Sequence, residues 1–231
     1  MLLDLHWLAA IDSRSLREYS LMIEWDTLIW LICYALVFAG LSAFGAHRIK
    51  ILWHYWRHRE GDSKAVSQFD ELPPVTIQLP LFNEALMVER LLKSVTSLDY
   101  PKDRLQIQVL DDSTDETAAE CARRCEELRR EGFDIQHHHR TDRTGFKAGA
   151  LDAAMPQATG RFICIFDADF LPAPDYLQKL IHHFTDPTIG MVQARWGHLN
   201  RNFSLLTKLQ ALFLDGHLVL EQSARSRRVG L

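Results

Sequence analysis

The chain has 231 residues, of which 47% are hydrophobic and 24% charged, with a formal net charge of -4. This composition excludes collagen-like, disordered and highly charged chains, and the length allows one domain with its own core plus an appended segment. The slight negative charge gives no general reason to bind nucleic acid, so we expect no nucleic-acid partner. None of the four cysteines occurs in a Cys-x-x-Cys pair or a metal-ligand spacing, which argues against disulfides and structural zinc.

An uncharged apolar run lies near the start of the chain. Residues 27–46 contain no Asp, Glu, Lys, Arg or His, and such a helix, at about 1.5 Å per residue, spans roughly 30 Å, one bilayer core. Basic residues concentrate after the run, interleaved with aromatic ones: Arg48, Lys50, Trp53, Tyr55, Trp56, Arg57, Arg59 and Lys64. Because Lys and Arg mark the cytoplasmic side, we expect a transmembrane helix in the cell (inner) membrane. Residues 1–26 would then be extracytoplasmic, the catalytic domain cytoplasmic, and membrane lipid a partner.

Residues 47–74 are expected to be a basic and aromatic interfacial segment followed by a linker, and residues 75–231 a domain. Strand patterns in this domain alternate with helical ones, which predicts an α/β fold with a mostly parallel sheet. The expected strands are 75–79, 105–110 and 162–166, and the last, being apolar throughout, is expected to be central. A helix with Leu177 and Ile181 on its apolar face is expected to precede a further short strand at 189–193.

Ligands of an open parallel sheet bind beyond the carboxyl ends of its strands. The sequence places mostly acidic residues there: Asn83, Glu84, Asp111, Asp112, Asp167 and Asp169. Lys147 opens a nearby Ala-rich helical stretch. These seven residues are therefore the candidate site.

Asp167 and Asp169 are separated by one residue, so an extended backbone would point both carboxylates to the same side. At about 4 Å, two such charges repel by roughly 4 kcal/mol at an effective dielectric near 20. A divalent cation would relieve this repulsion, and carboxylate oxygens suit Mg²⁺ or Mn²⁺. The alternative is a pair of solvated loop acids.

Asp111 and Asp112 also have two interpretations. They could form a turn before a helix capped by a residue of the following Ser-Thr-Asp run, or they could bind the hydroxyls or base of a nucleotide. Lys147 could be an exposed helix lysine. A cation near a helix N-terminus is unfavourable unless an anion is also present, which suits a phosphate.

Four motifs together resemble those of family 2 glycosyltransferases: PLFNE at 80–84, VLDDSTDET at 109–117, RTGFKAGAL at 143–151 and FDADF at 166–170. The following tail is similar to that of the cellulose-synthase-like branch, especially its mannan and glucomannan synthases. The resemblance implies a GT-A fold, which is a nucleotide-sugar-binding αβα sandwich. It also implies an inverting enzyme that transfers a hexose from a UDP- or GDP-hexose to a growing β-linked polysaccharide.

The resemblance also assigns roles to residues. Asp112 would be the catalytic donor-side carboxylate that contacts the nucleoside, with Asp111 beside it. Lys147 would meet the diphosphate, and Asp167 and Asp169 would hold the metal and diphosphate. Two further positions would border the nucleoside pocket: Asn83 and Glu84.

In the cellulose-synthase-like branch, the acceptor-side carboxylate, a Gln-x-x-Arg-Trp motif and further membrane helices follow the point where this chain stops. We therefore expect a C-terminally incomplete chain without its general base. Asp215 and Glu221 are expected to be polar positions of an apolar helix rather than that base. Two alternatives stay open, a polyprenyl-phosphate glycosyltransferase that adds a single sugar and a truncated nucleotide-sugar-binding protein without turnover.

Other conspicuous residues are not expected to act. His137, His138 and His139 are consecutive in an expected strand, where neighbours point in opposite directions, so we expect no joint metal binding. Cys121 and Cys125 fall on the apolar stripe of a helix and are expected to pack in the core.

Overall fold

The computed structural model describes residues 13–58, 65–216 and 218. The chain divides into two units, of which residues 63–194 form one and the segments before and after it the other. Parts of the expected N-terminal segment, linker and tail, Glu221 among them, lie outside the described residues.

The elements follow one another along the chain as α1 (Ser13–His58), β1 (Val75–Leu81), α2 (Ala85–Thr96), η2 (Lys102–Arg104), β2 (Leu105–Asp111), α3 (Thr117–Arg130), β3 (Asp134–His139), α4 (Phe146–Ala154), η3 (Met155–Gln157), β4 (Phe162–Ile165), α5 (Tyr176–Ile181), η4 (His182–Thr185) and α6 (Leu205–Asp215).

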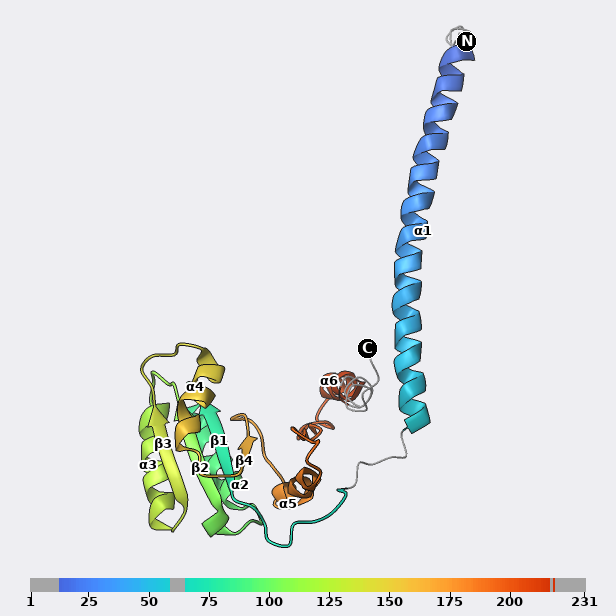
Figure 1. The fold of residues 1–231 in the computed structure, drawn as a ribbon. Helices are drawn as coiled ribbons and strands as arrows, with labels where there is room; N and C mark the ends of the chain where they lie inside the picture. Colours follow the sequence, from blue (N-terminus) through green and yellow to red (C-terminus); the bar gives the residue numbers. More distant parts are fainter. Residues whose placement is uncertain (1–12, 59–64, 217, 219–231) are drawn as a thin grey trace. The chain divides into compact units, whose positions relative to one another are not determined.

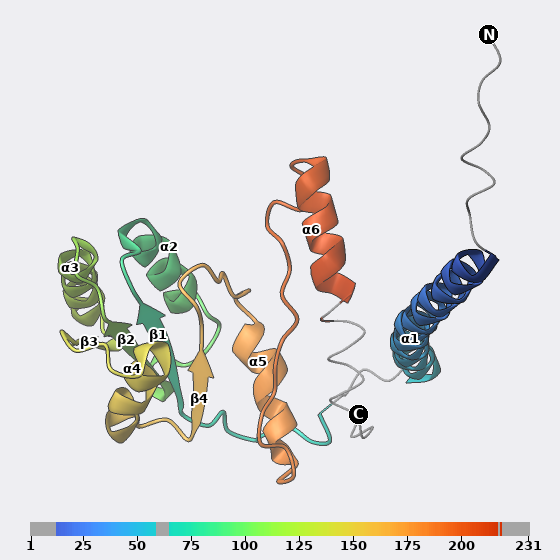
Figure 2. The same ribbon diagram turned by 90° about the horizontal axis from the view of Figure 1, so that it is seen from above.

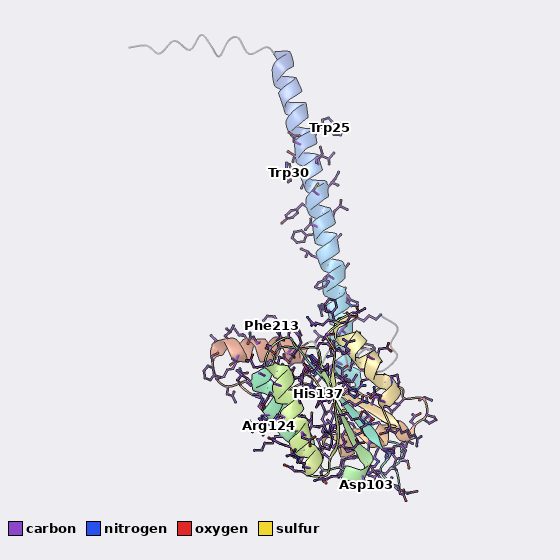
Figure 3. All side chains as sticks on the ribbon, turned by 90° about the vertical axis from the view of Figure 1, so that its left-hand side faces the viewer. Trp25, Trp30, Asp103, Arg124, His137 and Phe213 are labelled. Atoms are coloured by element: carbon purple, nitrogen blue, oxygen red, sulfur yellow. The ribbon has the colours of Figure 1, made fainter. Side chains whose placement is uncertain are left out.

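Helix α1 is 46 residues long and extends past the predicted span 27–46 at both ends. Neither of its flanking segments contains Gly or Pro, so nothing in the sequence ends the helix at the edge of the apolar run. Its stretch Trp25–Arg57 is strongly apolar, and none of its most apolar part is buried within the structure. Trp25 and Trp30 project from it (Figure 3). By length and composition alone, this one helix of the described residues is long and apolar enough to cross a membrane.

A four-stranded sheet in the order β3-β2-β1-β4 forms the centre of the second unit (Figure 1). All three pairings are parallel, as the alternation of strands and helices predicted. Strand β4, predicted to be central, instead pairs only with β1 among the described strands and lies at an edge of this sheet. Its residues are only partly buried and Ile165 is 45% exposed, although the Phe162 ring lies 4.7 Å from the Phe184 ring. The apolar run thus indicated a strand, but neither full burial nor a central position in the sheet.

The predicted strand at 189–193 is also wrong, because these residues are not in a strand. Met191 is 79% exposed. Alternation of apolar residues does not make a strand where no neighbouring strand supplies the hydrogen bonds.

Helices α2 and α3 lie on one side of the strands and α4 on the other (Figure 2). Apolar side chains of β1 and β2, such as Ile77 and Ile107, are 0% exposed in the core beneath α2 and α3. The helices contribute their apolar stripes to this core: Val88, Leu91, Leu92, Val95, Cys121 and Cys125. The predicted core packing of both cysteines is confirmed, at 0% and 1% exposure.

The opposite face of β1 and β2, toward α4, is lined by polar side chains. Four of them are at most 3% exposed: Thr76, Gln78, Gln106 and Gln108. Gln78 donates to the Gln108 Oε1 at 3.0 Å, and Gln108 donates to the carbonyl of Ala154 at 3.2 Å. Gln106 donates to the carbonyl of Gln157 at 3.1 Å. These bonds satisfy buried polar groups and hold the C-terminal end of α4 and the following η3 turn on the sheet.

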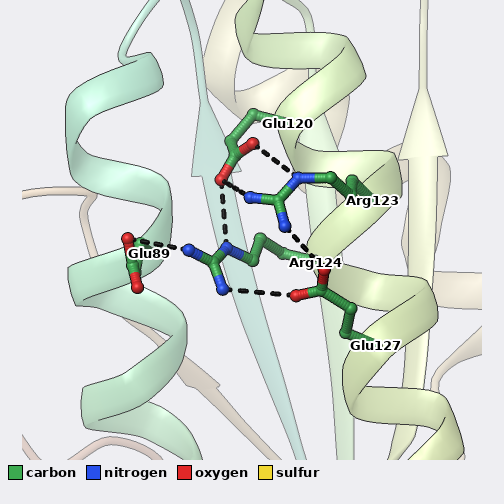
Figure 4. A network of polar contacts seen from close by, with 5 residues as sticks. All are labelled: Glu89, Glu120, Arg123, Arg124 and Glu127. Atoms are coloured by element: carbon green, nitrogen blue, oxygen red, sulfur yellow. Dashed lines mark hydrogen bonds and ion pairs between the residues drawn. The ribbon is translucent and has the colours of Figure 1, made fainter.

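A surface network joins α3 to α2 (Figure 4). Arg124 contacts Glu89 at 2.7 Å, Glu120 at 3.0 Å and Glu127 at 3.2 Å, and Arg123 bridges the same two α3 glutamates at 2.6 Å. Exposed pairs of this kind stabilise a fold by about 0.2–1 kcal/mol each. The network therefore adds little beside the apolar core.

Helix α6 belongs to the other unit and begins with a capping box, in which the Ser204 Oγ accepts from the Thr207 N–H and the Thr207 side chain from the Ser204 N–H. Phe213 is 80% exposed on this helix (Figure 3). The Asp215 carboxylate of this helix forms an ion pair with Arg201 at 3.1 Å.

Candidate functional site

The carboxyl ends of β1 and β2 are fastened to each other. The Asp112 N–H donates to the carbonyl of Leu81 at 3.1 Å, and the Asn83 N–H donates to the Ser113 hydroxyl at 2.9 Å. The Asn83 side chain accepts from the Thr114 N–H at 2.9 Å. Asn83 has φ 54°, a left-handed conformation that Asn tolerates better than most residues. This turn places the residues after both strands at one edge.

Three carboxylates and one lysine meet at this edge. Lys147 pairs with Asp167. Partial burial, then the charges of Asp169 and Asp167, raise the pKa of Glu84 above its ordinary value. The expected extended backbone is absent, because β4 ends before Asp167 and the Phe170 N–H donates to the Asp167 carbonyl at 3.0 Å, closing a turn. The turn still brings both aspartates close enough to Glu84 to raise its pKa.

Glycines bring the start of α4 to the same edge. Gly145 precedes the helix with φ 76°, a conformation that L residues rarely adopt. A Cβ on Gly149 would lie 2.0 Å from the Thr144 carbonyl oxygen, so this approach requires glycine. The close turn sets Lys147 in the first turn of α4, where the Asp167 carboxylate supplies an anion near the helix N-terminus.

Asp112 is held by an arginine that the sequence interpretation did not single out. Arg140 donates from Nε to Asp112 Oδ1 at 2.8 Å and from Nη2 to Oδ2 at 2.7 Å, and Asp112 is 5% exposed. Nη2 of Arg140 also donates to the carbonyl of Phe146 at 3.2 Å. The residue after Phe146 is Lys147, so Arg140 connects the end of β2 to the start of α4. Asp112 and Lys147 therefore lie at the same edge.

Asp111 is 0% exposed and turned into the fold. Its carboxylate lies 3.0 Å from His137 Nε2 and 3.0 Å from His139 Nδ1, and accepts from the Ser113 N–H at 2.9 Å. Burial by itself raises the pKa of Asp111, but hydrogen bonds from His137, Ser113 and His139 outweigh it and lower the pKa to about 2. The sequence expectation considered adjacent histidines and overlooked the alternate pair. His137 and His139 share one side of β3, and only His138 between them points away.

Comparisons with known proteins agree with this arrangement. The family model Glycosyl transferase family 2 matches residues 76–224. The chain belongs to this family. Over 159 residues it is 41% identical to glucomannan 4-beta-mannosyltransferase 1 of Oryza sativa subsp. japonica and 39% identical to glucomannan 4-beta-mannosyltransferase 2 of Arabidopsis thaliana. Each match covers 67% of this chain and 30% of the relative.

A solved structure supports the fold. The mannosyltransferase PcManGT from Pyrobaculum calidifontis, in complex with GDP-Man and Mn²⁺, matches with a TM-score of 0.55 and 34% identity over 64% of this chain and 44% of that one. The predicted class, a GT-A-like α/β domain with a mostly parallel sheet, is confirmed. The roles assigned to the seven site residues stay predictions.

Two contacts at this sheet edge were not predicted from the sequence. Arg140 lies in a loop between β3 and α4, 28 residues from its partner, where no periodicity predicts a contact. Arg143, the first residue of the RTGFKAGAL motif, places its guanidinium carbon 3.3 Å from the ring centroid of Phe82 in PLFNE. The two motifs thus meet through a stacked pair at the site edge.

Proposed function

We propose that the chain is the donor-binding part of a membrane-anchored inverting glycosyltransferase that transfers a hexose from a nucleotide-diphosphate sugar to a growing β-linked polysaccharide. The observation that carries the proposal is the meeting of Glu84, Asp167 and Lys147 at one sheet edge, beside the paired Asp112 and Arg140. The names of the plant relatives and the GDP-Man complex of PcManGT support a hexosyl donor, GDP-mannose in particular, with UDP-hexose as the other candidate.

The chain's own residues divide the work of holding the donor. Asp112, oriented by Arg140, contacts the nucleoside. The buried Asp111 holds this end of β2 through its contacts with His137, His139 and Ser113. Asn83 and Glu84 border the nucleoside pocket. Lys147 releases its carboxylate partner to meet the diphosphate, a stronger anion at the same helix terminus.

The acidic edge fits a divalent cation. Glu84, Asp167 and Asp169 supply hard oxygen donors, and the pKa of Glu84 is raised first by burial and then by the negative charges of Asp169 and Asp167. Mg²⁺ and Mn²⁺ both suit such donors, and PcManGT was solved with Mn²⁺. A cation bound there would neutralise the oxygens of the departing nucleoside diphosphate. We propose Asp167 and Asp169 as the residues that hold it.

Calorimetric binding of GDP-mannose and UDP-glucose, with and without Mn²⁺, tests the proposal. Asp169→Asn should lower the metal-dependent donor affinity by at least about tenfold, or 1.4 kcal/mol. The matched control is Asp175→Asn, which removes an exposed carboxylate paired with Lys179 at 2.6 Å. Equal donor affinities for Asp169→Asn and the unmodified chain would contradict the proposal.

We propose that α1 spans the membrane, with residues 1–26 extracytoplasmic, 27–46 transmembrane, 47–74 interfacial and linking, and 75–231 a cytoplasmic catalytic domain. The inner membrane of the cell is the proposed location. Cysteines introduced at positions on either side, Ser13→Cys and Ser67→Cys, test the orientation with an impermeant maleimide. The cysteine at position 13 should be labelled on intact cells and the cysteine at position 67 only after lysis. The reverse pattern would refute the proposed orientation.

Product length separates this function from its alternatives. Transfer to a growing polysaccharide predicts products of increasing length from the full-length protein, whereas a polyprenyl-phosphate acceptor predicts a single addition to lipid. Donor binding without any product would identify a chain that binds nucleotide-sugar without turnover.

A further inference from the structure

Two histidines of one strand converge on one buried carboxylate oxygen of the next. His137 Nε2 and His139 Nδ1 each lie 3.0 Å from Asp111 Oδ2, and the three ligand atoms all lie within 4.8 Å of one another. The register of β2 with β3 produces this convergence, because Val109 pairs with His137 and Asp111 with His139. The cluster is therefore fixed by the sheet rather than by a loop.

We propose that Asp111, His137 and His139 form a second metal site, which takes a zinc-like, imidazole-preferring divalent cation and is separate from the acidic donor site. Ligands about 2.0–2.1 Å from a tetrahedral zinc stand about 3.3–3.4 Å apart. The two 3.0 Å separations are within a few tenths of an ångström of that spacing. The two imidazole nitrogens would also have to approach each other, by at most about 1.5 Å, to complete three corners of the tetrahedron.

Charge and exposure agree with a cation at this position. The Asp111 side chain is 0% exposed, while the side chains of His137 and His139 are 16% and 36% exposed. Among the described residues, the Asp111 carboxylate is contacted by the two imidazoles and by Ser113, and none of these carries a permanent charge. A cation would compensate the buried charge. The exposed side, at His139, leaves a route for the metal and room for a fourth ligand from solvent.

The ligand types separate this site from the donor site. Two imidazole nitrogens and one carboxylate favour Zn²⁺ or Co²⁺, whereas the oxygens of Asp167 and Asp169 favour Mg²⁺ or Mn²⁺. We therefore expect Zn²⁺ to bind the histidine site in the presence of excess Mg²⁺. The two sites are distinguishable by metal and by variant.

The site would fasten the edge strand β3 to β2. Among the described strands, β3 pairs only with β2, and both imidazoles come from the carboxyl end of β3. The next residue after His139 is Arg140, whose N–H donates to the Asp111 carbonyl at 2.9 Å. Metal bound here would hold the strand end from which Arg140 reaches Asp112.

The test uses the full chain in detergent micelles, free of any polyhistidine tag. Co²⁺ should give the intense visible absorption of a tetrahedral site at one equivalent, and Zn²⁺ should abolish it and raise the thermal midpoint of unfolding. His139→Gln, at the more exposed ligand, should weaken Zn²⁺ binding by more than about 100-fold, since it removes a direct ligand. His137→Gln should do the same. The matched control is His138→Gln, between the two ligands, which should leave the Co²⁺ spectrum unchanged.

Failure here is separable from failure of the proposed function. Asp169→Asn should leave the Co²⁺ spectrum intact, and His139→Gln should keep a Mn²⁺-dependent increase in donor affinity. Absence of a tetrahedral Co²⁺ spectrum in the unmodified chain would overturn the second site. A spectrum retained in both His137→Gln and His139→Gln would also overturn it, since the metal would then lie elsewhere among the 11 histidines.

Discussion

Arg140→Gln should destabilise the sheet-bearing unit through the carboxylate that it leaves behind. Arg140 makes two hydrogen bonds to Asp112, at 2.8 and 2.7 Å, with side-chain exposures of 21% for Arg140 and 6% for Asp112. Removing one member of a buried ion pair typically costs 3–5 kcal/mol, because the remaining charge is uncompensated. Arg140 keeps some contact with solvent, so we expect the lower end, about 3 kcal/mol. Arg140→Lys keeps the charge but not the paired geometry, and should cost about half as much.

Pulse proteolysis of the full chain in urea measures this free energy of unfolding. Arg130→Gln is the control, since Arg130 is 75% exposed in its pair with Glu126 and its loss should change the free energy by less than about 0.5 kcal/mol. Combining Arg140→Gln with Asp112→Asn removes both charges, and we expect a loss smaller than the sum of the single losses by about 2 kcal/mol. Similar losses for Arg140→Gln and Arg130→Gln, or simple additivity in the double variant, would refute the reasoning.

Two further substitutions test the site edge. The pKa of Glu84 is raised by burial and by the two neighbouring aspartates, so its ionised form disfavours the fold above the raised pKa, and this penalty vanishes below the unfolded pKa. Glu84→Gln should therefore raise the thermal midpoint at pH 7 but not at low pH, and an equal shift at both would contradict the assignment. Gly149→Ala should lower the free energy of unfolding by about 3 kcal/mol, because the new Cβ would lie 2.0 Å from the Thr144 carbonyl oxygen. The control is Gly190→Ala, which places its Cβ in open space and should change the free energy of unfolding little. Equal thermal midpoints for the two variants would show that the turn before α4 can relax.

The parallel sheet was predictable because its evidence is local. Strands β1 and β2 alternate apolar and polar residues, and the helices between strands carry stripes such as Val88, Leu91 and Val95. The position of β4 was not predictable, because a continuous apolar run is typical of a central strand, yet β4 lies at an edge of the sheet and its residues are only partly buried. The burial of Gln78 and Gln108 was not predictable either, since alternation does not say whether the polar side meets water or a helix.

The candidate site shows the same limit. The acidic residues that follow the strands predicted which edge of the sheet carries the site, because the carboxyl ends of parallel strands meet at one edge. The contacts within that edge depend on distant loops. Arg140 reaches Asp112 from a segment without periodicity, and the His137 and His139 pair depends on strand register, which a single sequence does not specify.

The glutamines beneath α4 restrict how far this helix can move on the sheet. A helix on an apolar surface can shift sideways with little change in energy, because dispersion contacts are nearly direction-independent. The end of α4 cannot do so without breaking directional bonds among buried groups, because its Ala154 carbonyl accepts from Gln108 and the Gln157 carbonyl of the following η3 turn accepts from Gln106. Sideways movement of α4 on the sheet is thereby suppressed, and this keeps Lys147, in the first turn of the helix and 52% exposed, in position to meet an incoming anion.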